Sequence, residues 1–90
     1  MAVTVRIPTT MRPLAGGATT VELEAGSLSD VIKALDHTHA GFAERLLENG
    51  ALRKFVNVFV DDDDVRYLDG LDTQVPDGQT VSIIPAVAGG

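Results

Sequence analysis

The chain has 90 residues, 44% of them hydrophobic, with 13 acidic and seven basic side chains and a formal net charge of −6. A chain of this length buries roughly 60–65% of the surface that its unfolded form exposes, which supplies one modest core and excludes a multidomain enzyme. The negative charge makes nucleic acid an unfavourable partner and a basic protein surface a better one. Because the chain has no cysteine, disulfides, Cys-based metal sites and thiol nucleophiles are excluded.

Two β-strands are expected first along the chain. Apolar residues alternate with polar ones over 3–7 and again over 19–24, which is the period of a half-buried strand. Pro8 ends the first strand because it has no amide hydrogen to donate to the next ladder bond. The glycines at 16 and 17 mark the connection, so the two segments predict a hairpin with a long loop.

A helix is expected next. Residues 28–35 carry apolar side chains at i, i+3, i+4 and i+7, the spacing of one helix face. Ser27 is the predicted N-cap, with an acidic residue three positions on in the first turn. Gly41 is expected to stop the helix, and 42–47 to add one or two further turns before the Asn-Gly pair at 49–50.

The segment 55–60 is β-branched and aromatic, with apolar residues on both faces, as in a central strand. The four aspartates at 61–64 predict a turn and 65–67 the returning strand. Carboxylates also bind Ca²⁺ or Mg²⁺, but this run lacks the spacing and the final Glu of an EF-hand loop. We therefore interpret it as a solvated acidic turn and expect no metal site.

The last part of the chain predicts a loop with a short helical turn over 68–75, a tight turn at 76–78 and a final strand over 80–84. The fold class is therefore α+β: a mixed sheet of four to five strands with one main helix packed across it, in the ubiquitin-like β-grasp order. In that order the last strand runs beside the first. We expect a β-grasp domain over 1–85 and a flexible C-terminal Gly-Gly tail over 86–90.

No catalytic residue is expected. His37 and His39 lie two apart on the helix, where side chains do not share a face, and each serine has a structural explanation. The N-terminal residues lack the build of a signal peptide, and the uncharged stretch 78–90 is shorter than the roughly 20 residues that span a bilayer. We expect a cytoplasmic protein that contacts neither membrane nor nucleic acid.

The C-terminal residues have two interpretations. Small residues are common at frayed termini, which is a structural explanation for the Gly-Gly sequence. The alternative is that Gly89 and Gly90 leave the terminal carboxylate unobstructed. Fully extended, 87–90 reaches roughly 13 Å, which is enough to enter a narrow cleft in another protein.

The segment 75–90, VPDGQTVSIIPAVAGG, resembles the C-terminal signature of the ThiS/MoaD family of ubiquitin-like sulfur carriers. The strand 55–60 with its acidic turn is similar to the central hairpin of a longer, actinobacterial-type branch of that family. This branch includes the carrier that feeds sulfur to cysteine biosynthesis. The resemblance extends over nearly the whole chain and implies a sulfur carrier.

The resemblance also implies a chemistry. An E1-like partner with adenylating or sulfurtransferase activity uses ATP to adenylate the carboxylate of Gly90, and sulfide or a persulfide then converts it to a thiocarboxylate. Val87, Ala88 and Gly89 present that carboxylate. A second enzyme, of cysteine-synthase type or another, accepts the sulfur. The carrier itself is no enzyme and binds no cofactor.

Docking requires an exposed surface. If the valines at 56, 58 and 60 face the core, Asn57 and Phe59 face outward beside Ile84 of the last strand, and these three are the predicted docking residues. The alternative is that the protein's own loops cover them. The acidic second half, 46–90, is expected to steer association with a basic partner.

Other functions remain open at this point. The same tail pattern occurs in the small subunit of molybdopterin synthase. A ubiquitin-like modifier would pass the Gly90 adenylate to a lysine amine instead of to sulfur. A β-grasp interaction module with an inert tail is the third alternative.

Overall fold

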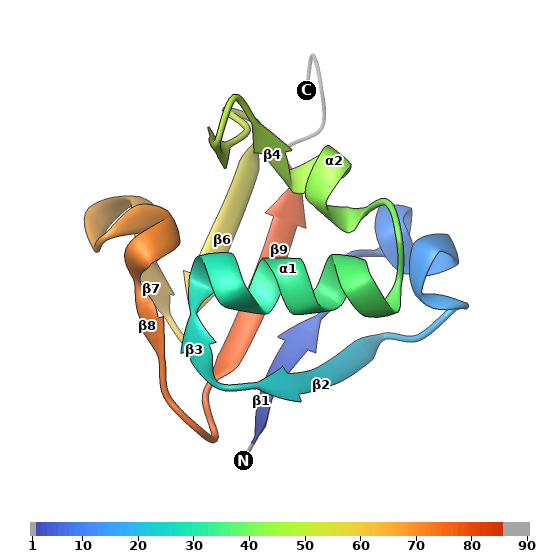
Figure 1. Ribbon diagram of the computed structural model, residues 1–90, viewed down its shortest axis with the longest axis horizontal. Helices are drawn as coiled ribbons and strands as arrows, with labels where there is room; N and C mark the ends of the chain where they lie inside the picture. The colour runs from blue at the N-terminus through green and yellow to red at the C-terminus, as the bar shows by residue number, and fades with distance from the viewer. Residues whose placement is uncertain (1, 86–90) are drawn as a thin grey trace.

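The computed structural model describes residues 2–85, and the structural statements below refer to them. A five-stranded mixed sheet has the order β2-β1-β9-β6-β7, with the helix α1 across one face (Figure 1). The strands are β1 (Ala2–Arg6), β2 (Thr20–Glu24), β6 (Val56–Val60), β7 (Asp63–Asp64) and β9 (Thr80–Pro85). Only the central pair, β1 and β9, is parallel. The predicted β-grasp architecture, with the last strand beside the first, is confirmed.

The main helix, α1 (Leu28–Thr38), forms as its sequence predicts. The hydroxyl of Ser27 accepts a hydrogen bond from the amide of Asp30 at 3.1 Å, which satisfies one free amide of the first turn. The apolar face of α1 is buried against the sheet, and it consists of Leu28, Val31, Ile32 and Leu35. Each such side chain contributes roughly 1.5–3 kcal/mol when it is removed from water, so this face attaches the helix to the sheet.

The helix ends before Gly41. Its last residue is Thr38, and Gly41, at φ +107°, instead precedes the short helix α2 (Phe42–Leu46). The Asp36 carboxylate accepts hydrogen bonds from the amides of Gly41 and Ala43, each at 3.0 Å. This carboxylate therefore joins the two helices. Gly41, the predicted helix stop, lies two residues after the α1 C-cap and is the N-cap residue of the second helix.

Two short strand pairs lie outside the main sheet. β3 (Gly26–Ser27) pairs with β8 (Gln74–Val75), and β4 (Leu47–Glu48) pairs with β5 (Ala51–Leu52). The second pair closes on Asn49 and Gly50, at φ +54° and +80°, the positive values that a two-residue hairpin turn requires. The predicted helical turns therefore end at Leu46, before the Asn-Gly pair, which forms the turn of the hairpin that follows.

The predicted returning strand at 65–67 is wrong. After the turn, β6 pairs with the two residues of β7 only, and Val65–Tyr67 form the 3₁₀ turn η2. The Asp64 carboxylate accepts the Arg66 amide at 2.9 Å, and this local bond competes with a strand ladder. The helical turn expected within 68–75 is η3 (Gly70–Asp72).

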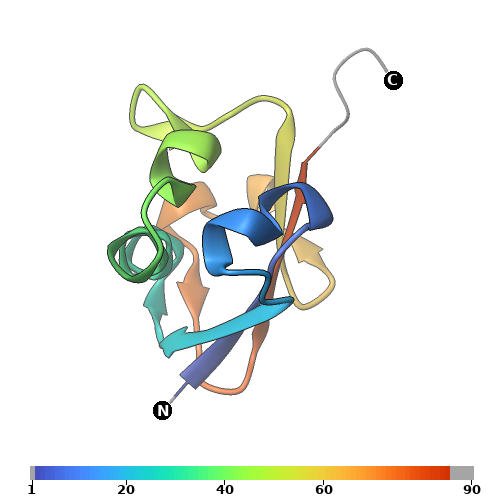
Figure 2. The same ribbon diagram turned by 90° about the vertical axis from the view of Figure 1, so that its right-hand side faces the viewer.

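The loop expected after the first strand contains a 3₁₀ helix. This element, η1 (Thr9–Ala15), inserts Met11 and Ala15 into the core. Its two buried residues are four positions apart, but Pro13 inside the segment and the glycines at 16 and 17 after it indicate a loop, which is why the sequence did not predict a helix here. Figure 2 shows η1 on the helix side of the sheet, near the end of β9.

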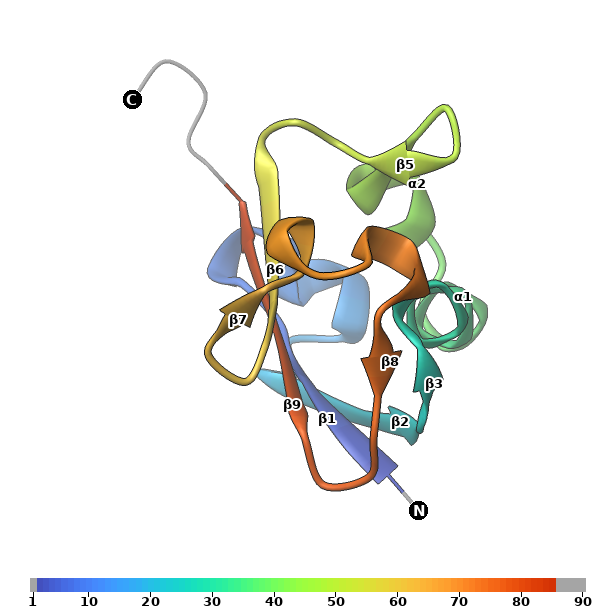
Figure 3. The ribbon, with the colours of Figure 1, turned by 90° about the vertical axis from the view of Figure 1, so that its left-hand side faces the viewer.

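The two ends of β9 lie at opposite ends of the molecule. At its start, the Gly78 amide donates to the carbonyl of Ala2 at 2.9 Å, close to the N-terminus. At its end, Pro85 pairs with Val56, the first residue of β6. Figures 2 and 3 view the sheet near edge-on and show α1 on one side of it only. No helix within residues 2–85 is long and apolar enough to cross a membrane.

Candidate docking face and tail exit

The described chain ends at Pro85, at the end of β9. The residues predicted to present the carboxylate, Val87, Ala88 and Gly89, lie outside the described residues, as does Gly90 and the whole predicted tail 86–90. What the structure fixes is the point from which these residues depart: Pro85 is held beside Val56 by the β6–β9 register.

The three predicted docking residues come together on the sheet face opposite α1. In the register, Asn57 pairs with Ile84, and Phe59 pairs with Ser82. The valines between them on β6 are buried, so strand alternation directs Asn57 and Phe59 to the other face. Ile84 is 49% exposed, while Phe59 and Asn57 are half-buried. We call Asn57, Phe59, Ser82 and Ile84 the outer face.

Arg66 holds the start of β6 beside this face. Its Nη2 donates to the backbone carbonyls of Arg53, Lys54 and Val56 at 2.9, 3.0 and 2.7 Å, and its Nη1 donates to the Asn57 side chain. The sequence did not single out Arg66, because nothing in the spacing links it to residues nine to 13 positions earlier. One guanidinium therefore fixes both a predicted docking residue and the strand that flanks Pro85.

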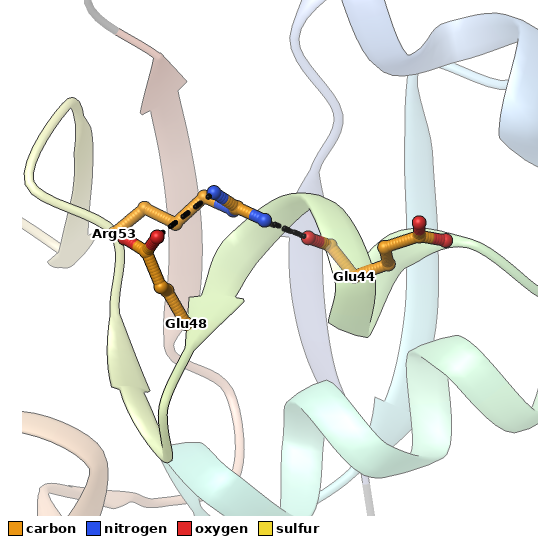
Figure 4. A network of polar contacts seen from close by, with 3 residues as sticks. All are labelled: Glu44, Glu48 and Arg53. Atoms are coloured by element: carbon orange, nitrogen blue, oxygen red, sulfur yellow. Dashed lines mark hydrogen bonds and ion pairs between the residues drawn. The ribbon is translucent and has the colours of Figure 1, made fainter.

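Arg53 makes a second connection at the same end of the molecule. Its Nε and Nη2 donate to the carbonyl of Glu44 at 3.1 and 3.0 Å, and its Nη1 lies 3.8 Å from Oε1 of Glu48 (Figure 4). The ion pair is exposed and contributes at most about 1 kcal/mol. The backbone bonds are the more important part, because they attach the segment before β6 to α2.

A groove adjoins the outer face where β9 ends. It has a volume of about 470 Å³ and runs between η1 and the ends of β1, β2 and β9. Two arginines, hydroxyl side chains and Pro85 line it together with apolar residues, and no Asp or Glu does. The polar side chains are Arg6, Thr9, Arg12, Thr19, Thr20 and Ser82. The sequence did not predict this groove.

The aspartate run begins at the other end of β9. The Asp61 amide donates to the Thr80 carbonyl at 2.7 Å, and its carboxylate accepts the Thr80 amide at 3.0 Å. Thr80 begins β9 and Pro85 ends it, so Asp61 is about 17 Å from the tail exit at about 3.3 Å per residue. Asp64, the last of the run, pairs with Phe59. Within the described residues, no cluster of three or more His, Asp or Glu is arranged to hold a metal ion.

Comparisons with known proteins agree on one family. The ThiS family model matches residues 5–90. A curated relative, "Sulfur carrier protein CysO" of Mycobacterium tuberculosis, is 46% identical over 93 residues that cover all of both chains. "Small archaeal modifier protein 3" of Haloferax volcanii is 41% identical over 64 residues, 71% of this chain and 70% of that one.

A solved structure that includes a CysO protein also matches the chain. The chain matches one chain of the crystal structure of the Amycolatopsis orientalis BexX/CysO complex with a TM-score of 0.95 and 45% identity. The match covers 99% of this chain and 100% of that one.

Proposed function

The chain belongs to the ThiS family, and from that membership we propose that it is a sulfur carrier protein that donates sulfur from Gly90 in cysteine biosynthesis. The observation that carries this proposal is the 46% identity to the CysO sulfur carrier over the full length of both chains. The carrier acts as a protein co-substrate of partner enzymes and supplies no catalytic group. The resemblance of the 75–90 signature supports Gly90 as the loaded residue.

The chemistry requires activation by a partner. A carboxylate does not exchange oxygen for sulfur directly, because oxide is a very poor leaving group. In our proposal an E1-like enzyme uses ATP to form an acyl-adenylate at Gly90 and releases pyrophosphate. Sulfide then attacks the acyl carbon, AMP leaves, and a thiocarboxylate remains. The ATP binds to the partner, and the carrier needs no cofactor.

We propose that the residues before Gly90 allow the tail to enter the active site of the partner. Gly89 has no side chain, and Val87 and Ala88 have small ones, which suits entry of the tail into a narrow cleft. We propose that the partner docks on the outer face through Ile84, Phe59 and Asn57. An exposed apolar side chain beside the tail exit supports this role, and so does the existence of a BexX/CysO complex for a relative.

The proposal is tested by a loading assay. Purified chain is incubated with ATP, sulfide and the adenylating enzyme of its own organism, and thiocarboxylate is measured by intact-protein mass spectrometry. We expect loading of the wild type, and no loading of a chain that lacks Gly90 or carries one added residue after it. Loading that persists in both variants would overturn the assignment of Gly90.

A second assay identifies the sulfur acceptor. The loaded carrier is offered O-phosphoserine with a cysteine-synthase-type enzyme, and in parallel a molybdopterin precursor with its synthase large subunit. We expect sulfur transfer only in the first reaction. Transfer only in the second would assign the chain as a molybdopterin synthase small subunit.

Protein modification is a second candidate function. It is favoured by the 41% identity to a small archaeal modifier protein. It predicts isopeptides between Gly90 and lysine side chains in lysate, and these are absent if the chain only carries sulfur. Immunoprecipitation of a tagged chain followed by peptide mass spectrometry distinguishes the two functions.

A further inference from the structure

We propose that the groove of Arg6 and Arg12 is a binding site for an acidic segment of the activating enzyme, seated beside the tail exit. This inference rests on the proposed function and adds the chemistry of the partner surface. The net charge of the chain predicts a basic partner surface, whereas the groove predicts an acidic partner segment at this one contact. Three features of the molecule support it: the distribution of charge, the unused donors of the two arginines, and the position of the groove.

Acidic side chains are unevenly distributed over the sheet. The net charge of −6 belongs to the whole chain, but Asp61 lies at the end of β9 that is remote from Pro85, and Asp64 lies on β7, on the far side of β6 from β9. The groove at the near end is lined by two arginines and by no acidic residue. An acidic partner segment is therefore attracted to the groove and repelled by the aspartates beside β6, which favours docking at the groove.

The two arginines have donors to spare. Arg12 uses Nε to donate to the Ile7 carbonyl at 3.2 Å, and its two Nη groups make no hydrogen bond within residues 2–85. Arg6 makes neither an ion pair nor a side-chain hydrogen bond with the described residues, where the one ion pair is Arg53–Glu48. A guanidinium fork matches the two oxygens of a carboxylate, and the Nε bond of Arg12 holds its fork in advance of binding.

The groove is continuous with the outer face. Arg6 pairs with Ser82, and Ser82 pairs with Phe59, so one row of side chains across the sheet joins the groove to the predicted docking residues. Ile84 and Pro85 also line the groove. A partner that receives the tail beyond Pro85 and covers Ile84 must cover the groove as well, and an unpaired carboxylate-binding fork would then be buried unless the partner supplies an acid.

The test measures the Michaelis constant for the carrier in the loading assay. Arg6→Glu/Arg12→Glu is compared with Lys33→Glu/Arg45→Glu, which makes the same charge change on α1 and α2. We expect the first variant to raise KM at least tenfold, with kcat within twofold, and the second to change KM less than twofold. Equal effects of the two variants would overturn the inference and leave only an effect of net charge.

Two further measurements distinguish binding of an acidic segment from nucleotide binding and from loss of folding. If the wild type loads and the groove variant raises the KM for ATP but not for the carrier, the groove binds a nucleotide phosphate and the acidic-segment proposal fails. Arg6→Gln and Arg12→Gln are tested singly, with thermal unfolding, because Arg12 also bonds to the Ile7 carbonyl. We expect each to raise KM at least threefold without lowering the unfolding temperature enough to unfold the chain in the assay.

A direct probe does not depend on loading. A hexaglutamate peptide is titrated into labelled wild-type chain and followed by amide chemical shifts. We expect shifts confined to residues 6–12, 19–20 and 82–85, and their loss in Arg6→Glu/Arg12→Glu. No shift in these segments would contradict the groove proposal even if the wild type loads, whereas failure of the wild type to load contradicts the sulfur-carrier proposal.

Discussion

At the residue scale, Arg66 connects its own turn to residues nine to 13 positions earlier in the chain. Its guanidinium bonds to three backbone carbonyls before and at the start of β6 and to the side chain of Asn57. No other residue within 2–85 makes so many side-chain bonds. Since Val56 pairs with Pro85, the bonds of Arg66 fix the strand edge from which the tail departs.

Replacement of Arg66 by alanine is predicted to destabilise the fold. Hydrogen bonds to a charged donor contribute about 1.5–3 kcal/mol when buried, and these are largely exposed, so we expect a loss of about 1–2 kcal/mol. The measurement is urea unfolding followed by circular dichroism. Arg45→Ala is the control, because the Arg45 side chain is exposed and makes no hydrogen bond to the described residues. Equal stability of the two variants would show that the Arg66 bonds contribute nothing.

At the element scale, α1 depends on its cap. Ser27→Ala removes the acceptor for the Asp30 amide and is predicted to lower the free energy of unfolding by about 1 kcal/mol. Ser29→Ala, in the first turn of the same helix, is the matched control and should change stability by less than half as much, because no cap bond is lost. A Ser27→Ala chain as stable as the wild type would exclude a role for this cap.

The outer face of β9 and β6 is predicted to act in docking and not in folding. Ile84→Ser should leave stability within about 1 kcal/mol, because Ile84 is 49% exposed, and should raise the loading KM several-fold. Leu68→Ser is the control, with a similar 47% exposure but a position after η2. An Ile84→Ser chain that loads with the wild-type KM would remove Ile84 from the docking surface.

The elements that could be predicted from the sequence are those whose apolar residues follow a regular strand or helix period. The alternation in β1, β2 and β6 and the apolar face of α1 are such patterns, and the Ser27 cap follows from them. The turn η2 was missed because the Asp64 carboxylate competes with the ladder that the apolar Val65 suggested. The groove was not predicted because it depends on the path of η1, which places Arg12 in the same groove as Arg6. No helix or strand period in the sequence indicates that path.

At the scale of the whole molecule, Asp61 lies at one end of β9, and Pro85 lies at the other beside a groove that no acidic side chain lines. The outward position of Asn57 and Phe59 could be predicted from sequence, because strand alternation decides which face they occupy. The position of Asp61 relative to the groove could not, since it depends on the strand order β1-β9-β6 and on the direction of β9. The net charge of the chain therefore governs long-range attraction between the carrier and a partner, whereas the arginines of the groove govern the contact that we propose.

Loading of sulfur at Gly90 is tested by fragmentation mass spectrometry of the chain after incubation with ATP, sulfide and the adenylating enzyme. We expect the intact mass to rise by the difference between one sulfur and one oxygen atom. We expect that difference to map to Gly90, with every fragment that lacks Gly90 unchanged. No mass change with an active enzyme, or a change that maps elsewhere, would contradict the assignment of this chain as a sulfur carrier loaded at Gly90.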